Sequence, residues 1–432
     1  MDQIGLFLFL PFFVTLLIGV PIAFCLGIAC ATFILLSDTR IQLFVLATES
    51  FTAINTYALL ALPMFVLTGE LLNRCQLTDK LIALAQQLVG WIKGGLAHVN
   101  ILTSMFFGGI SGSSLADAAS IGPLLIPAMV KQRFPAGFSA AVTASSSVIG
   151  AIIPPSIPLI IVGGQLQISI GGLFAAGLLP GILTGFALML TAFVICLVRD
   201  YGEIRPFEGV IPVARSTVRA SPALVIPIWI IGGILSGIFT PTEAGAVAVL
   251  YTMLIGRFFY RSLSRRDLTE ALASTVRVTA SALLIVAMAI VFGRILTFHQ
   301  FPQQLVGLIL GITENPIVLF FVLVLFFLFV GTFMDAIANM IILGPLLMPL
   351  AIAGLDMHPL QYGVFLMYNL LLGITTPPLG LALFVVTPIA GVGIERVSVA
   401  TIPFLFAQIG VLALIVFVPQ ITLFLPSLAG LA

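Results

Sequence analysis

Two short polar segments interrupt this very apolar chain, and each contains residue types that can bind a cation. The first is GGISGSSLAD at 108–117 and the second is VGTFMDAIAN at 330–339. Because glycine is flexible and serine hydroxyls compete for backbone hydrogen bonds, neither segment favours a continuous helix. Each is therefore expected to form the tip of a helical hairpin, where carbonyl and hydroxyl oxygens become free. Such oxygens are hard ligands suited to Na+, and Asp335 would add a carboxylate.

A proline pair follows each polar segment and should break the helix that contains it. The pairs lie in GAIIPPS at 150–156 and in GITTPPL at 373–379. Proline has no N–H to donate, so carbonyls about one turn upstream lose their partners, which a membrane tolerates only where they face protein or water. Tip and break together could thus enclose Na+ in each half. The predicted Na+ ligands are Ser111, Gly112, Ser113, Ser114, Pro154 and Pro155 in the first half and Gly331, Thr332, Asp335, Thr375 and Thr376 in the second.

The two polar segments belong to an internal repeat. GPLLIP at 122–127 returns as GPLLMP at 344–349, which aligns Asp335 with Ser113 and Asn339 with Asp117. One explanation is that the small residues merely permit close helix packing and the prolines merely kink the helices. Two copies in register, each with a tip and a break, favour the other explanation. A duplicated membrane segment with matching interruptions is typical of a secondary transporter.

Composition places the chain in a membrane. It is 60% hydrophobic and 8% charged, with a mean hydropathy of +1.25. Charge-free stretches such as 134–198 and 357–394 are long enough for one or more spans of about 20 residues. The sequence therefore predicts an all-α polytopic membrane protein. Its 3 histidines are scattered and its 4 cysteines form no CxxC pair, so neither a metal cluster nor a catalytic constellation is visible, and we expect no enzyme.

Each half is predicted to cross the membrane five times. The segments of the first half are spans 4–20, 22–37 and 55–73, an arm near 41–53, an amphipathic segment near 78–92, a re-entrant hairpin at 97–130, a broken span at 137–164 and a span at 172–198. Those of the second are spans 221–239, 242–260 and 280–298, an arm near 265–278, a hairpin at 315–352, a broken span at 361–388 and a span at 402–425. An odd number of crossings inverts the second repeat.

The distribution of positive charge predicts the orientation. With the N-terminus outside, 15 of the 17 Lys and Arg residues fall on the inner side, and the exceptions are Arg40 and Arg294. This bias follows the positive-inside rule. The polar segment 199–220 then becomes a cytoplasmic linker between a first repeat at 1–198 and a second repeat at 221–432.

Three residues are candidates to bind a substrate carboxylate between the tips: the hydroxyls of Ser114 and Thr376 and the guanidinium of Arg294. Alternatively, Arg294 has no role in substrate binding and its side chain only extends to the outer membrane–water interface. The role of Asp117 also has two possible interpretations. It is either a functional intramembrane acid or a first-turn acid stabilised by its helix dipole.

Five stretches carry a family resemblance: GGISGSSLADAASIGPLLIPAM, GAIIPPSIPLIIVG, TPTEAGAVAV, GTFMDAIANMIILGPLLMPL and GITTPPLGLALFVV. They resemble the large membrane subunit of the tripartite ATP-independent periplasmic (TRAP) transporters, the DctM-like family, over nearly the whole chain. The resemblance implies an ion-coupled elevator fold with two inverted repeats, re-entrant hairpins and broken helices. It implies Na+ as the coupling ion, and it places the Na+ sites at the tips and breaks named above.

The resemblance also implies the partners. A periplasmic binding protein would deliver an organic acid, and a small four-helix membrane subunit would pack beside the scaffold. Because the chain begins with the large subunit's first span, we expect the small membrane subunit to be a separate polypeptide. The expected location is the bacterial inner membrane, with this chain's N-terminus in the periplasm. The alternative is a stand-alone Na+/dicarboxylate symporter of the same fold group. The sequence does not separate C4-dicarboxylates, sialic acid, other sugar acids and 2-oxo acids as substrates.

Overall fold

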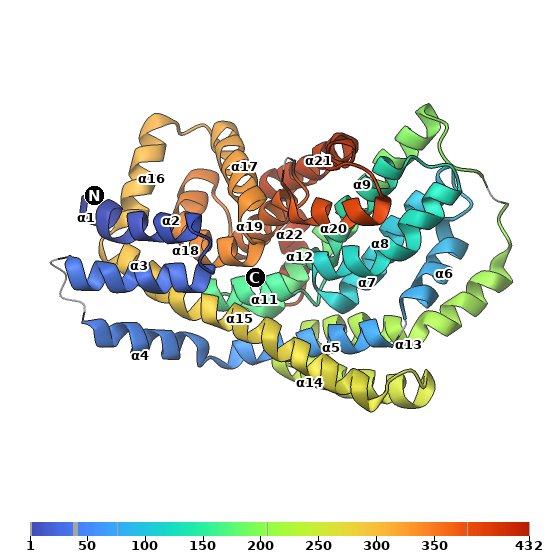
Figure 1. Ribbon diagram of the computed structural model, residues 1–432, viewed down its shortest axis with the longest axis horizontal. Coiled ribbons are helices and arrows are strands. Elements are labelled where there is room, and N and C mark those ends of the chain that lie inside the picture. Colours follow the sequence, from blue (N-terminus) through green and yellow to red (C-terminus); the bar gives the residue numbers. More distant parts are fainter. Residues whose placement is uncertain (1, 38–41, 76, 205, 378, 432) are drawn as a thin grey trace.

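Helices make up every regular element in the part of the chain that the computed structural model describes, which is residues 2–37, 42–75, 77–204, 206–377 and 379–431 (Figure 1). The elements of the first half are α1 (Asp2–Ile4), η1 (Gly5–Phe9), α2 (Leu10–Leu17), α3 (Ile22–Leu36), α4 (Leu43–Ile54), η2 (Tyr57–Leu60), α5 (Ala61–Arg74), α6 (Thr78–Val89), α7 (Gly95–Ser111), α8 (Ser114–Lys131), α9 (Ala136–Ser147), α10 (Ile149–Ile152), α11 (Ile157–Leu166) and α12 (Ile170–Val198). The sequence prediction of an all-helical chain is thus confirmed.

The second half follows the same order. Its elements are α13 (Val210–Leu235), α14 (Pro241–Leu254), η3 (Ile255–Phe259), α15 (Arg265–Phe298), α16 (Phe301–Ile312), α17 (Pro316–Phe333), α18 (Ala336–Leu355), α19 (Pro359–Gly373), α20 (Leu381–Ala390), α21 (Ile394–Phe417) and α22 (Gln420–Leu428). Seven of the described helices are long and apolar enough to cross a membrane, and the pair 136–152 and 157–166, bent by 47°, makes an eighth candidate. The chain is therefore a multi-pass membrane protein with a broken span where the first proline pair predicts one.

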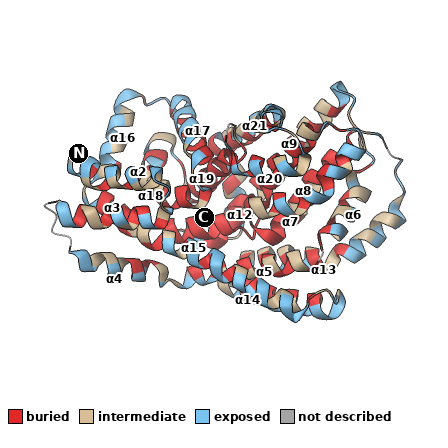
Figure 2. Cartoon of the chain, viewed as in Figure 1, coloured by how far each residue is buried: buried red, intermediate tan, exposed pale blue. Residues whose placement is uncertain are grey.

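Two layers organise these helices. In Figure 1 the helices α3, α4, α5, α14 and α15 run along one side of the molecule, and α15 packs against α3, α4 and α5. We call this group, with α1, α2 and α13, the scaffold layer. The hairpins α7–α8 and α17–α18 and the broken helices lie in a second layer, the hairpin layer, which also contains α12, α21 and α22. Many of the buried residues lie in the middle of the molecule, around α19, α12 and α7 (Figure 2).

The two repeats interlock within the hairpin layer. The distal half of each broken helix packs against the hairpin of the other repeat, because α11 contacts α18 and α20 contacts α8. The pairs α9–α21 and α12–α19 add further contacts between the repeats. Neither half could bury its apolar faces alone, so the layer is expected to fold as one unit.

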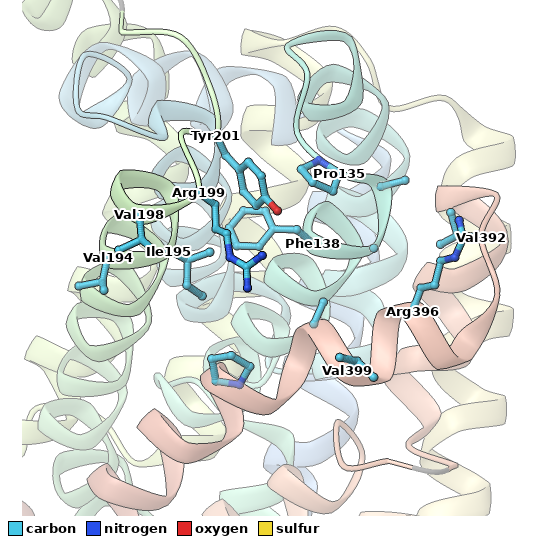
Figure 3. A pocket seen from close by; sticks show the side chains of 14 residues that line it. Pro135, Phe138, Val194, Ile195, Val198, Arg199, Tyr201, Val392, Arg396 and Val399 are labelled. Atoms are coloured by element: carbon cyan, nitrogen blue, oxygen red, sulfur yellow. The ribbon is translucent and has the colours of Figure 1, made fainter.

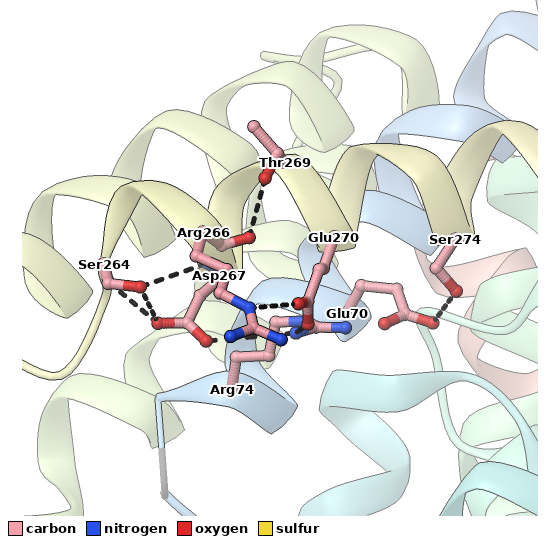
Figure 4. A network of polar contacts seen from close by, with 8 residues as sticks. All are labelled: Glu70, Arg74, Ser264, Arg266, Asp267, Thr269, Glu270 and Ser274. Carbon is pink, nitrogen blue, oxygen red and sulfur yellow. Dashed lines mark hydrogen bonds and ion pairs between the residues drawn. The ribbon is translucent and has the colours of Figure 1, made fainter.

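A polar cluster fastens α5 to the start of α15 at one edge of the scaffold layer (Figure 4). Glu270 receives hydrogen bonds from Arg74 and from Arg266, each at 2.8 Å, and Ser274 donates to Glu70 at 2.7 Å. Exposed ion pairs of this kind contribute at most about 1 kcal/mol each. Their effect here is to fix the register of a helix of the first repeat against one of the second.

The structure corrects several predicted segments. The arm at 265–278 and the span at 280–298 form one continuous helix of 34 residues, because a capping box at Ser264 starts it and no proline interrupts it. Helix α13 begins at Val210, inside the predicted linker 199–220, and the last span 402–425 is divided between α21 and α22.

Smaller differences concern the ends and one missed element. The first helix ends at Leu17, before the predicted limit of 20, and α16 has no predicted counterpart. The first residue of the predicted arm at 41, together with Arg40, Arg205 and Pro378, lies outside the described residues.

Candidate ion and substrate site

The first hairpin turns at Gly112, which separates α7 from α8. Its φ of +62° lies in the left-handed region, and a Cβ at this position would come within 2.7 Å of the Pro155 carbonyl oxygen. Only glycine meets both demands. The Gly112 carbonyl also accepts a hydrogen bond from the Ile157 N–H at 3.3 Å. The tip of the first hairpin therefore rests directly on the break of the first broken helix.

Two serines organise the helix ends at this contact. Ser113 is the N-cap of α8, and its hydroxyl accepts a hydrogen bond from the Ala116 N–H at 3.5 Å. Ser156 donates to the Ala151 carbonyl at 2.5 Å and accepts from the Leu159 N–H at 3.2 Å, so one hydroxyl joins both sides of the break. Such caps satisfy backbone groups that a broken helix would otherwise leave unpaired.

The second hairpin repeats this construction with different chemistry. Asp335 is the N-cap of α18 and accepts hydrogen bonds from the N–H groups of Ile337 at 3.0 Å and Ala338 at 3.3 Å. Asn339 donates to the carbonyls of Val330 and Met334, each at 3.4 Å, and so closes the tip from below. Asp335 thus occupies the position that Ser113 occupies in the first repeat, as the alignment predicts.

Pairs of glycines bring each hairpin against its own broken helix. A Cβ on Gly108 would lie 2.9 Å from the Gly150 Cα, and a Cβ on Gly331 would lie 3.0 Å from the Gly373 Cα. The two pairs make similar contacts at a separation of 223 residues, one more than the 222 residues that separate Asp335 from Ser113. In both repeats the hairpin thus packs against the broken helix just before its break. Because α17 and α18 are each long enough to span a bilayer, the re-entrant form of the hairpins stays a prediction.

The hydroxyls at the second site keep acceptor capacity. Thr375 and Thr376 both donate to the Leu372 carbonyl, at 3.0 and 2.7 Å, and Thr332 donates to the Phe329 carbonyl at 2.7 Å. A hydroxyl that donates to a carbonyl retains two lone pairs, which suit a hard cation. At the first site the Ser114 hydroxyl is buried without a hydrogen-bond partner among the described residues. Both sites therefore contain the hard oxygen atoms that Na+ prefers, and the binding of Na+ stays a prediction.

A buried polar cluster lies beside the first tip; Asp117 was already a candidate from the sequence, whereas Asn100, Ser104 and Thr143 were not predicted. Asn100 donates to Thr143 at 2.7 Å and accepts from Ser146 at 3.3 Å, and Ser104 donates to Ser146 at 3.0 Å. Asp117 is fully buried next to Gly150, and both of its carboxylate oxygens lack a hydrogen-bond partner among the described residues. A buried charge without a partner is costly, and a cation or a proton nearby would offset that cost.

A sequence signal for this cluster exists. Asn100 and Ser104 are four residues apart, and Thr143 and Ser146 are three apart, so each pair shares one helix face in a segment with little charge. Asn369 is a further missed residue. It is fully buried in α19 just before the second break, and both atoms of its amide lack partners among the described residues.

Arg294 lies apart from these tip contacts. It is in the last third of α15, its side chain is 65% exposed, and its guanidinium donates to Glu49 of α4 in the scaffold layer. Ser114 and Thr376, the other two predicted substrate ligands, each lie at a tip or a break. The role of all three in substrate binding stays a prediction.

Comparisons with known proteins show the family of this chain. The family model of the TRAP transporter DctM component matches residues 9–421. The sialic acid TRAP transporter large permease protein SiaM of Vibrio cholerae is 40% identical over 411 residues, which cover 95% of each chain. The C4-dicarboxylate TRAP transporter large permease protein DctM of Pseudomonas aeruginosa is 33% identical and covers 90% of each chain.

Solved structures support the fold at low identity. The YdaH transporter of Alcanivorax borkumensis superposes with a TM-score of 0.62 at 16% identity, over 86% of each chain. MtrF of Neisseria gonorrhoeae, an antimetabolite efflux pump, gives a TM-score of 0.58 at 14% identity, over 94% of this chain and 95% of that one. The relatives in the family are named as transporter permeases, in agreement with the prediction that the chain is no enzyme. This chain belongs to the DctM family, the large membrane component of the TRAP transporters.

Proposed function

We propose that this chain is the large permease of a Na+-coupled, binding-protein-dependent importer of small organic acids, and that it works by an elevator motion. One observation carries the proposal. Each hairpin meets its own broken helix just before the break through a glycine pair, and the nearby segments contain oxygens that have no hydrogen-bond partner within the described part of the chain, such as that of Ser114, or that donate without accepting there, such as those of Thr375 and Thr376. Two such sites, related by the internal repeat, are what an ion-coupled transporter places at its centre.

The residues of the two sites have distinct tasks in this mechanism. At the first site Ser111, Ser114 and the carbonyls beside Pro155 would hold one ion, and at the second Thr332, Asp335 and Thr375 would hold another. The ions supply positive charge where a substrate carboxylate binds. Bound ions would also order both tips, since each tip donates oxygens from two chain segments. The hairpin layer would then cross the membrane along the scaffold layer.

The substrate carboxylate would lie between the tips. Ser114 and Thr376 can donate hydroxyl hydrogen bonds to it there. Arg294 could contribute only after leaving Glu49, so its part in the proposal requires a rearrangement of α4 or α15. Sialic acid and C4-dicarboxylates, which the names of the relatives mention, are the first substrates to test.

Partners and location follow from family membership. A small membrane subunit would pack against the scaffold layer, and a periplasmic binding protein would deliver the substrate. The bacterial inner membrane, with the N-terminus periplasmic, is the location that the distribution of Lys and Arg supports.

Uptake into proteoliposomes that contain this chain and its small subunit tests the proposal. Labelled sialic acid, succinate and 2-oxo acids are offered with and without an inward Na+ gradient, each with and without the cognate binding protein. We expect uptake only when the gradient and the binding protein are both present. Na+-driven uptake without a binding protein would favour the stand-alone symporter. Uptake at the same rate with and without the Na+ gradient would contradict the proposed ion sites.

The variant Asp335→Asn tests the second ion site. Asparagine keeps the helix cap and removes the charge, so stability should hold while the Na+ concentration for half-maximal uptake rises roughly tenfold. Asp356→Asn is the matched control, because Asp356 lies exposed at the other end of the same helix. If both variants keep the parent's Na+ dependence, Asp335 serves only as a helix cap.

A further inference from the structure

A crevice of about 730 Å³ opens far from the hairpin tips, between α9, α12 and α21 (Figure 3). The C-terminal end of α12, the N-terminal end of α9 and the N-terminal end of α21 form its walls. Helices α9 and α12 belong to the first repeat and α21 to the second. The crevice is therefore a place where the two repeats meet at the surface of the hairpin layer.

Two arginines line this crevice, Arg199 just after α12 and Arg396 in the first turn of α21. Both are exposed, and neither forms an ion pair with an acid among the described residues. The acids next to them in sequence face elsewhere. Asp200 binds Lys93 at 2.7 Å, and the Glu395 carboxylate turns back over Gly393. Two positive charges thus remain available inside one crevice.

Apart from Tyr201, the rest of the lining is apolar and continues onto the outer surface of the membrane helices. Val194, Val198 and Val399 are 49%, 74% and 68% exposed, and Phe138 lies buried at the base. Exposed valines on membrane helices are suited to contact acyl chains. The crevice therefore combines an apolar trough with two guanidinium groups at one end of the helices, where the bilayer meets water.

We propose that this crevice binds an anionic phospholipid, with the phosphate between Arg199 and Arg396 and an acyl chain along the trough. Basic pockets between membrane helices are suited to anionic headgroups, and a guanidinium matches the geometry of phosphate oxygens. A soluble anion would use the arginines but leave the trough uncovered. An anionic lipid would use both features, because its phosphate would pair with the arginines and its acyl chain would cover the exposed valines of the trough.

The lipid would bridge the repeats. Helix α21 already packs against α9 and α12, and a bound phosphate would add a link between the α12 end and the α21 start. This inference does not depend on the transported substrate or on Na+. Its failure and the failure of the proposed function are therefore distinguishable.

Native mass spectrometry of the full chain tests the proposal. Protein stripped of lipid in detergent is mixed with equal amounts of phosphatidylglycerol and phosphatidylcholine of the same acyl composition. We expect phosphatidylglycerol to be retained on the order of tenfold more than phosphatidylcholine, because phosphatidylglycerol presents a net negative charge to the two arginines, whereas choline cancels the charge of the phosphate in phosphatidylcholine. In Arg199→Gln/Arg396→Gln this preference should disappear, and in Arg199→Lys/Arg396→Lys much of it should remain.

A second double variant is the matched control. Arg257→Gln/Arg265→Gln removes the same net charge from two exposed arginines that do not line the crevice, and the preference should stay as in the parent. Equal retention of the two lipids by the parent chain would overturn the proposal. So would a preference that survives Arg199→Gln/Arg396→Gln, or one lost equally in the control. Displacement of the lipid by millimolar inorganic phosphate alone would show that the trough contributes nothing and would also overturn it.

Discussion

The two hairpin tips share a construction but differ in their surroundings. At the first tip Ser111 and Gly112 are buried, and the tip packs against the scaffold layer. A Cβ on Gly69 of α5 would lie 3.1 Å from the Ser111 carbonyl oxygen, and one on Gly109 would lie 2.8 Å from Pro227 of α13. At the second tip Asp335 is exposed and Phe333 is 58% exposed. The tip of the first hairpin is therefore covered by the scaffold, whereas the second hairpin contacts the scaffold helix α15 through α18 and leaves its tip uncovered.

The two hairpins also differ at their bases, which are the starts of α7 and α17 opposite the tips. Just before α7, Lys93 donates to Asp200 at 2.7 Å and to the Gly202 carbonyl at 3.0 Å, which ties the first hairpin to the segment after α12. At the base of α17, Asn315 makes local cap hydrogen bonds, and the described residues there show no ion pair. A duplicated sequence thus yields two similar tips, while unequal neighbours decide which tip is covered and which base is tied by an ion pair. We expect the second hairpin to be the more mobile one.

The largest expected effect comes from locking the first tip to the scaffold. In Gly69→Cys/Ser111→Cys the two sulfurs should form a disulfide, since a Cβ on Gly69 would lie only 3.3 Å from the Ser111 Cα. If the hairpin layer moves along the scaffold, uptake should fall to background under oxidant and return with reductant. Each single variant is the control for the cysteines themselves. Full uptake by the cross-linked protein would mean that this tip and α5 never separate.

A smaller effect is expected from Gly112→Ala. The alanine would adopt a left-handed φ, at about 1–2 kcal/mol, and its Cβ would approach the Pro155 oxygen to 2.7 Å, which adds roughly 1–3 kcal/mol of overpacking. Gly391→Ala is the matched control, because Gly391 has a φ of +64° and nothing within 4 Å of its Cβ position. Unfolding in detergent micelles should show Gly112→Ala to be clearly the less stable. Equal losses would mean that the tip adjusts to the break without cost.

The sequence predicted the parts of the site that local chemistry determines. Glycine, serine and proline act on their own backbone, so a hairpin tip within 108–117 and a break near Pro155 follow from residue type and spacing, whereas the helix caps at Ser113 and Asp335 were not predicted. The internal repeat then predicted which residues of the two hairpins are equivalent, such as Ser113 and Asp335. These features need no knowledge of distant neighbours.

Contacts between distant segments could not be predicted in this way. Nothing near Gly69 indicates that it faces Ser111, and nothing near Arg294 indicates that Glu49 of another helix receives its hydrogen bond. The continuity of α15 is a different case. Its sequence contains no breaker, but the repeat suggested an arm and a span, and the local helix propensity prevailed.

The smallest expected effect concerns the fastening of the first hairpin's base. The hydrogen bond from Lys93 and the charge of its ammonium lower the pKa of Asp200 below its ordinary value. A carboxyl whose pKa is lower in the folded state stabilises that state above its unfolded pKa of about 3.9, and loses this contribution as the pH falls through the folded value. Since the Asp200 side chain is 91% exposed, salt should weaken the contact as well.

Hydrogen exchange at the start of α7 would measure this contribution. Asp200→Asn at neutral pH should speed exchange there slightly and leave the start of α17 unchanged, because only the first hairpin has this contact. In the parent chain, after correction for the intrinsic exchange rate, the same acceleration should appear with added salt, and also at acidic pH as the pH falls through the lowered pKa of Asp200 in the folded chain. Equal acceleration at both hairpin bases would indicate a general loosening, and the difference between the hairpins would then rest on the tip contacts with α5 and α13 alone.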